Sequence, residues 1–171
     1  ISSALPQNND LKFNRITVEQ GLSHDNVFGI IQDKDGFMWF ATQDGLDKYD
    51  GYSFDIFRHD PTNPQSLATS NFGKIYQDRS GIIWCGTFGG GLDEFNPKTN
   101  IFIHHRHRYA DTTSISNNRI RFIFEDREKE LWIGTSEGGV DIYNIKRNVF
   151  QNYTYDPNDR NTLSDKRAKC I

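Results

Sequence analysis

The sequence has few of the features that mark membrane-spanning, nucleic-acid-binding or catalytic chains. Its 171 residues contain no apolar run near the ~18 residues that a membrane-spanning helix needs. A formal net charge of −3 at pH 7 gives no support to a nucleic-acid-binding surface. There is no phosphate-binding glycine loop, no serine–histidine–aspartate order and no suggestive pair of carboxylates. These absences favour a binding module over an enzyme.

What the sequence does contain is one short pattern that occurs three times. Each copy has an aspartate, a tryptophan six residues later and a threonine three residues after that, at 33–42, 78–87 and 126–135. Successive tryptophans are 45 and then 48 residues apart. A near-constant period of this size, made of short apolar runs and glycine-containing turns, is typical of β-propeller blades.

The residues that recur in every copy are interpreted as structural. The tryptophans are predicted to pack between neighbouring blades, and the small residue two positions later lets adjacent sheets approach closely. The aspartates are expected to accept backbone hydrogen bonds at a hairpin corner. This structural set is Trp39, Trp84, Trp132, Asp33, Asp78, Asp126, Thr42, Thr87 and Thr135.

The turn after each aspartate ends at Gly36, Gly81 or Lys129. Glycine tolerates the positive φ that such tight turns often require. Lys129 therefore predicts that the third turn is either strained or of another type.

The two cysteines are predicted to be core residues and not a disulfide. Cys85 stands where the other copies have Phe40 and Ile133, and Cys170 aligns with Phe122. A thiol in place of a large apolar side chain is most simply a small buried hydrophobe.

We predict an all-β chain of about three four-stranded antiparallel blades. Blade 1 spans residues 22–66, blade 2 spans 67–114 and blade 3 spans 115–162. Residues 1–21 are expected to include an outer strand that closes a missing blade, and residues 163–171 to begin a truncated fourth blade. A seven-bladed ring would need roughly 320 residues at this period, so we expect the chain to be a propeller fragment.

The first strand of each blade is predicted to lie near the propeller axis. Its mixture of alternating and adjacent apolar residues suits a strand that is buried on both faces. These strands are predicted at residues 26–32, 72–77 and 120–125.

The complete repeat resembles the two-component regulator propeller repeat. Its pattern reads Leu-Ser-x-x-x-Val-x-x-Ile-x-x-Asp-x-x-Gly-x-x-Trp-x-x-Thr-x-x-Gly-Leu-x-x-Tyr and covers residues 22–49, 67–95 and 115–143. The resemblance extends over nearly the whole chain, because many positions recur three times in order. Its departures from the pattern include Ala68, Phe95, Lys129 and Val140.

The resemblance implies the periplasmic sensor region of a bacterial hybrid two-component protein. Sensors of this family commonly respond to carbohydrate fragments and act on transcription through a membrane helix, a histidine kinase and a receiver. It further implies a non-enzymatic segment without cofactor or metal that binds an oligosaccharide and no nucleic acid. Its partners would be the remaining blades of the parent sensor and, in the full-length protein, a second copy as a homodimer.

Candidate ligand-binding residues lie in the connections between the second and third strands of each copy. Asp44, Phe88 and Glu137 differ between copies while the strands around them agree. Variable residues on a repeated scaffold often carry recognition. An aromatic ring such as Phe88 can stack on a sugar, and carboxylates can bind its hydroxyls. The alternative is that these are ordinary solvated turns.

The run His-His-Arg-His-Arg at residues 104–108 is unusual in composition. His105 and His107 could bind a metal, whereas Arg106 and Arg108 could bind an acidic sugar or a sulfate. No supporting cysteine–histidine spacing favours the metal. A solvated edge strand, whose charge opposes pairing with another edge, is the simpler interpretation.

Arg119 and Arg121 form a second cationic pair, on the predicted first strand of blade 3. They either line the central channel or neutralise acidic residues on adjacent blades.

Three functions remain in competition. A ligand-sensing segment of a sensor kinase predicts a reading frame that also encodes a membrane helix and a kinase. A polysaccharide-active propeller enzyme predicts turnover that depends on a few unrepeated loop residues. A protein-binding scaffold predicts a stable complex without a small-molecule ligand.

Overall fold

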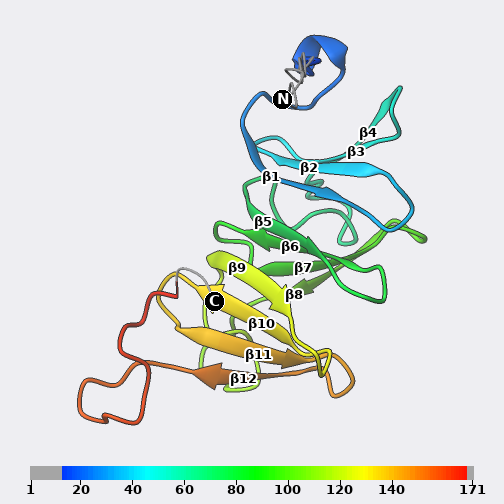
Figure 1. Cartoon of the computed structure of the whole chain (residues 1–171). Helices are drawn as coiled ribbons and strands as arrows, with labels where there is room; N and C mark the ends of the chain where they lie inside the picture. Colours follow the sequence, from blue (N-terminus) through cyan, green and yellow to red (C-terminus); the bar gives the residue numbers. More distant parts are fainter. Residues whose placement is uncertain (1–12, 169–171) are drawn as a thin grey trace, which may run out of the picture.

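Three four-stranded antiparallel sheets follow one another along the chain (Figure 1). The computed structural model describes residues 13–168. In chain order the strands are β1 (Val27–Gln32), β2 (Met38–Thr42), β3 (Leu46–Tyr49), β4 (Phe54–Phe57), β5 (Phe72–Gln77), β6 (Ile83–Thr87), β7 (Leu92–Asn96), β8 (Ile101–His105), β9 (Ile120–Glu125), β10 (Leu131–Thr135), β11 (Val140–Asn144) and β12 (Val149–Tyr153). The predicted all-β fold and its four-stranded blades are confirmed, and each predicted first strand is correct to within one residue.

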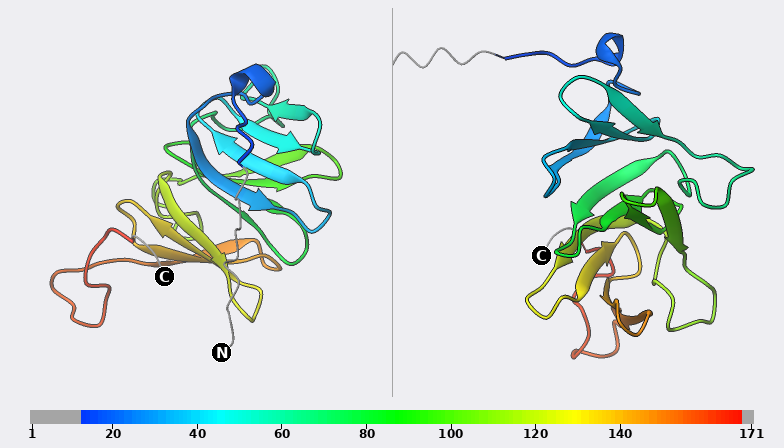
Figure 2. Two further views of the ribbon diagram at one scale, coloured as in Figure 1. Left: turned by 45° about the horizontal axis from the view of Figure 1, so that its top comes forward. Right: turned by 90° about the vertical axis from the view of Figure 1, so that its right-hand side faces the viewer.

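The sheets are arranged as consecutive propeller blades. Within each sheet the strands pair in chain order, so β1, β5 and β9 are all edge strands. These three first strands lie beside one another, β1 next to β5 and β5 next to β9. Figure 2 shows this stacking from two other directions, with the connections between blades projecting from the sheets.

The first strands are not buried on both faces as the sequence pattern predicted. Strand β1 alternates in exposure, with Phe28 and Ile30 exposed over 37% and 55% of their surface, and Phe124 of β9 is also exposed. The sheets between residues 13 and 168 form an arc, so the inner side of these edge strands is open to solvent.

The tryptophans pack between neighbouring blades, as predicted. Trp39 and Trp84 have no exposed surface. The ring of Trp39 lies 5.6 Å from that of Phe95 in blade 2, and the ring of Trp84 lies 5.7 Å from that of Tyr143 in blade 3. Trp132 belongs to the last described sheet and is half-buried, because no further sheet between residues 13 and 168 covers it.

Close approach of the sheets requires the small residue after the tryptophan. A Cβ added at Gly86 would lie 2.6 Å from Cγ2 of Ile120 in the next blade. Cys85 beside it is a free, fully buried core residue, and burial raises the pKa of its thiol well above the usual value. The corresponding prediction for Cys170 falls outside the described residues.

Partial blades are predicted at both ends of the chain, and the first of them falls partly within the described residues. Residues 13–17 form no strand and precede η1 (Val18–Gln20), a 3₁₀ turn that Thr17 caps. Because a strand is defined by the partner with which it pairs, the proposed outer strand stays a prediction, and its first residues, 11 and 12, lie outside the described range. Between residues 13 and 168, η1 supplies all of the helix, and it is far too short to cross a bilayer.

At the other end, residues 163–168 contact blade 3 in the way that blade 3 contacts blade 2. The amide of Gly139 donates to the carbonyl of Lys166 at 2.9 Å, and the amide of Gly91 donates to the equivalent Asn118 carbonyl at 3.0 Å. This is the register that the alignment of residues 163–171 with the start of blade 3 implies. The start of a fourth blade stays a prediction, and residues 169–171 lie outside the described range.

The three aspartate turns share one backbone conformation. Gly36 and Gly81 have φ of 92° and 95°, and Lys129 has φ of 67°. The third turn is therefore of the same left-handed type and carries the strain of a side chain there. Of the two alternatives that the sequence left open, the strained turn is correct.

This strain gives the first testable prediction. A side chain in the left-handed region costs about 1–2 kcal/mol, and glycine adds about 0.5–1 kcal/mol of unfolded-state entropy. We expect Lys129→Gly to raise the free energy of unfolding by about 0.5–1 kcal/mol in urea denaturation. The matched control is Gly36→Lys in blade 1, where nothing lies within 4 Å of an added Cβ; it should be destabilising. A Lys129→Gly variant less stable than the parent would contradict the assignment.

Candidate functional site

Each repeated aspartate holds its hairpin turn and its tryptophan together. In blade 2 the indole Nε1–H of Trp84 donates to Oδ2 of Asp78 at 2.8 Å. Oδ1 of the same carboxylate accepts the backbone amides of Ser80 and Ile82 at 2.9 and 3.0 Å. The other two blades repeat the indole contact, Trp39 to Asp33 at 2.7 Å and Trp132 to Asp126 at 2.8 Å. These aspartates thus form turns, as the sequence indicated, and also satisfy the buried indole N–H.

The repeated threonines fix the loop between the second and third strands. Oγ1 of Thr87 donates to the carbonyl of Gly91 at 2.8 Å and accepts the amide of Gly90 at 2.9 Å. The threonines of blades 1 and 3 make the same donation, Thr42 to Gly45 at 3.1 Å and Thr135 to Gly139 at 3.2 Å. The variable loop residues are therefore presented from a loop of fixed shape.

A second set of buried aspartates was missed by the sequence analysis. Asp47, Asp93 and Asp141 lie on the third strands and have no exposed surface. Each accepts the amide of a residue that leads into its blade, from Ser23 at 2.7 Å, Ala68 at 2.8 Å and Ser116 at 3.0 Å. The signal was present in the sequence, because every copy has an aspartate two positions after the glycine that opens the third strand.

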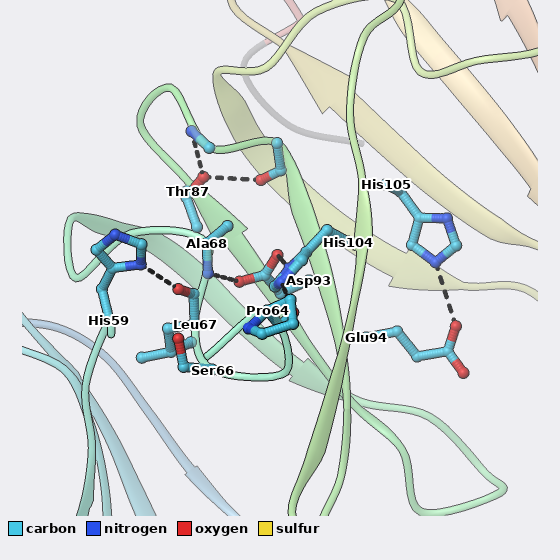
Figure 3. A network of polar contacts seen from close by, with 12 residues as sticks. His59, Pro64, Ser66, Leu67, Ala68, Thr87, Asp93, Glu94, His104 and His105 are labelled. Carbon is cyan, nitrogen blue, oxygen red and sulfur yellow. Dashed lines mark hydrogen bonds and ion pairs between the residues drawn. The ribbon is translucent and has the colours of Figure 1, made fainter. Parts of the chain in front are cut away.

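Blades 2 and 3 satisfy the other oxygen of this aspartate with different donors. Oδ1 of Asp93 pairs with Nδ1 of His104 at 2.7 Å, while Nε2 of the same ring lies 3.0 Å from the carbonyl of Pro64 (Figure 3). In blade 3, Nδ2 of Asn152 donates to Oδ1 of Asp141 at 2.7 Å.

Blade 1 has an apolar residue, Ile56, at the equivalent cross-strand position. Register places Ile56 opposite Asp47, as it places His104 opposite Asp93. Oδ1 of Asp47 is buried and has no hydrogen-bond partner within residues 13–168. Burial raises the pKa of the Asp47 carboxyl, as it does for Asp141.

His104 links a buried carboxylate to the connection between blades 1 and 2. Both ring nitrogens face oxygen acceptors, so the protonated imidazolium, with two N–H donors, makes both contacts. The hydrogen bond to Asp93 raises the pKa of His104. The neighbouring His105 lies on the other side of β8, where its Nε2 is 3.2 Å from Glu94 (Figure 3).

The histidines of the 104–108 run each have separate partners. The ring of His105 packs 5.0 Å from that of Tyr143, and Nδ1 of His107 lies 2.9 Å from the carbonyl of Ile115. Within the described range no three metal-ligating side chains are grouped together. Arg106 and Arg108 line a hollow of about 280 Å³ beside the outer strand β8, but Arg108 is already paired with Asp111 at 2.7 Å.

Phe88 and Arg121 are brought together on the inner side of the sheets. They line a hollow of about 300 Å³ with Gly73, Lys74 and Ile120. We call this the inner hollow.

Phe28 of blade 1 adjoins the inner hollow. Its ring meets that of Phe88 edge-to-face, with the centroids 6.3 Å apart. Three successive blades therefore contribute to this region. Sequence reasoning found Phe88 and Arg121 but missed Phe28 and Lys74, which nothing in the repeat distinguishes.

Arg121 of β9 and Arg119, which immediately precedes this strand, are exposed beside this hollow. Nε of Arg121 donates to Oγ of the buried Ser136 at 2.9 Å, and Arg119 forms an isolated β-bridge with Phe88. Neither arginine forms an ion pair with a carboxylate between residues 13 and 168. That they line a central channel stays a prediction, since residues 13–168 form an arc and not a closed ring.

The remaining candidates are not part of the inner hollow. Asp44 forms an ion pair with Arg58 at 2.9 Å, and both side chains are about half-exposed. Glu137 is exposed on the loop that follows β10. These two carboxylates fit the interpretation of solvated turns.

Comparison with known proteins identifies the repeat. The sequence model described as "Two component regulator propeller" matches residues 21–44 and 114–137, in the first and third blades. A protein named histidine kinase P4, from Formosa agariphila, is 42% identical over 62 residues, which are 36% of this chain and 4% of that protein.

A solved structure matches nearly the whole chain. It is the extracellular domain of BT3049 from B. thetaiotaomicron, a protein assigned to the hybrid two component systems. The TM-score is 0.83 at 29% identity, and the match covers 92% of this chain and 22% of that domain. The chain therefore spans a small part of the proteins that it resembles.

The unpaired oxygen of Asp47 gives the second prediction. Ile56→Asn places an amide donor where blade 3 has Asn152, so it should be more stable than Ile56→Ala, which loses the same apolar contact without gaining a donor. We expect a difference of about 1 kcal/mol in urea denaturation at pH 7, with a lower Asp47 pKa in carboxyl NMR titration. Equal stability of the two variants would contradict the pairing.

The His104 contact predicts a pH dependence of stability. Because its folded pKa is raised, the contribution of the contact is complete below the unfolded pKa of about 6.5 and is lost as pH rises through the folded value. The stability of the parent should therefore fall, relative to His104→Asn, by on the order of 1 kcal/mol between pH 6 and pH 9. The reverse exchange, Asn152→His, should introduce the same dependence in blade 3. A constant difference across this range would contradict the imidazolium assignment.

Proposed function

Because the chain carries two-component regulator propeller repeats, we propose that it is a ligand-sensing segment in the periplasmic part of a hybrid two-component sensor kinase. The observation that carries this proposal is the match of nearly the whole chain to the extracellular domain of such a system. In this proposal the remaining blades of the sensor complete the ring.

We propose binding and not catalysis as the role of this segment. The polar residues that recur in every blade are engaged in structural hydrogen bonds, as Asp78, Thr87 and Asp93 show in blade 2. The residues that remain available for a ligand are unrepeated and lie around the inner hollow. The repeats and the fold fit a non-enzymatic domain.

The proposed ligand is an oligosaccharide. Phe88 presents an aromatic ring with 37% of its surface exposed, and its backbone amide is fixed by the carbonyl of Asn71 at 3.0 Å. Aromatic faces on a rigid loop suit the apolar face of a sugar ring. Binding would change the packing of two sensors in a homodimer, and a membrane helix would transmit the change to a phosphorelay that controls transcription.

The test uses the complete extracytoplasmic region that contains this chain. Isothermal titration and thermal-shift measurements with a panel of oligosaccharides should find a ligand, and Phe88→Ala should weaken its binding about tenfold, which is ~1.4 kcal/mol. The control is Tyr109→Ala, an almost fully exposed aromatic on the connection between blades 2 and 3. Failure of every oligosaccharide to bind, or a reading frame without a membrane helix and kinase, would overturn the proposal.

A further inference from the structure

The inner hollow carries an unbalanced positive charge. Lys74 and Arg121 line it, Arg119 lies next to Phe88 at its margin, and none of its lining residues is acidic. The chain as a whole has a formal net charge of −3, so this excess of cations is local. Within residues 13–168 none of the three cations forms an ion pair.

Two other hollows that contain cations differ from this one. The hollow beside β8 has Arg108 paired with Asp111, and the hollow below blades 2 and 3 is lined by Asp78, Glu125, Glu128 and Glu130. One of these arginines is therefore ion-paired and the second hollow is rich in carboxylates, whereas Arg106 beside β8 forms no ion pair within residues 13–168. The inner hollow is the one of these three that combines two cations unpaired in the described part of the chain with an exposed aromatic ring.

The cationic and aromatic groups of the inner hollow are held in place. Arg121 is anchored through Nε to the buried Ser136, which leaves its two terminal NH₂ groups for another acceptor. Phe88 is fixed by its backbone and by its edge-to-face contact with Phe28. Anchoring lowers the entropy cost of ordering these side chains on a ligand.

Glycine at position 73 keeps the hollow open. A Cβ at Gly73 would lie 2.9 Å from the carbonyl oxygen of Ile120 and 3.4 Å from Cζ of Phe88. A side chain there would press on the backbone of β9 and on the ring of Phe88. The hollow thus depends on the close approach of β5 and β9.

We infer that the inner hollow binds an anionic saccharide, one that carries a carboxylate or a sulfate next to a sugar ring. Arginine binds such oxyanions through paired N–H donors, and lysine supplies a further point charge. Phe88 covers the apolar face of the adjoining sugar. This inference rests on the proposed function and specifies the ligand class of the same site.

The test compares saccharides that differ in charge, with the complete extracytoplasmic region. The panel is a uronic-acid trisaccharide, a sulfated trisaccharide, a neutral trisaccharide and inorganic sulfate, each measured by isothermal titration. We expect at least one anionic trisaccharide to bind about tenfold or more tightly than the neutral one, with an affinity that falls as salt is raised. Preference for uronate or for sulfate identifies the source of the anion.

The variants Lys74→Gln and Arg121→Gln should each weaken binding of that trisaccharide by about tenfold. The matched control is Arg106→Gln, an exposed arginine on the outer side of blade 2, which should leave the affinity unchanged. Thermal melting of each variant checks that it is folded.

The outcomes separate this inference from the proposed function. Neutral and anionic trisaccharides that bind equally, with Lys74→Gln and Arg121→Gln unchanged, would overturn the anionic ligand and leave the sensor proposal standing. A loss caused by Arg106→Gln alone would overturn the inner hollow as the site. Binding of inorganic sulfate with no saccharide bound would overturn both.

Discussion

Burial of an indole ring between successive sheets, with its N–H bound by the aspartate of its own hairpin, is the constraint on which the blade arrangement depends. An unpaired buried N–H would cost roughly 1–3 kcal/mol. Asp78 removes this cost at Trp84 and, with its other oxygen, fixes the turn that leads into the strand. One residue pair therefore couples the local turn to the packing of the next blade. In a ring of such blades, the loop sequences can vary while the packing of the sheets stays the same.

The second buried aspartate shows how far a repeat can vary around a fixed contact. Its link to the start of the blade is the same in all three sheets. Its other oxygen has a histidine partner in blade 2, an asparagine partner in blade 3 and no partner within residues 13–168 in blade 1. The blades thus differ in local stability and in response to pH although their backbones agree. His104 also contacts the carbonyl of Pro64, in the connection that precedes blade 2. Deprotonation of His104 would therefore weaken the attachment of this inter-blade loop.

The residues that recur in every blade and those that line the inner hollow are different. Repeated aspartates and threonines are engaged in hydrogen bonds within the frame, and the inner hollow is formed by residues that the repeat does not specify. Its aromatic and cationic groups come from the first strands and from one loop, which the rigid blades hold at a constant separation. In the function that we propose, a ligand that contacts two neighbouring blades would change the angle between their sheets. A sensor could transmit such a change.

The sequence by itself determined the strands, the turns and the place of the tryptophans, because alternation, turn chemistry and a regular period are local properties of the chain. It also left two alternatives for Lys129, a strained turn or a turn of another type, and the backbone of the folded protein shows the strained one. Only the tertiary structure decided that Phe28, Phe88 and Arg121 meet, since they come from three blades and their proximity depends on how each sheet is rotated against the next. The unpaired oxygen of Asp47 was likewise hidden, because it follows from cross-strand register and burial and not from any residue's own identity.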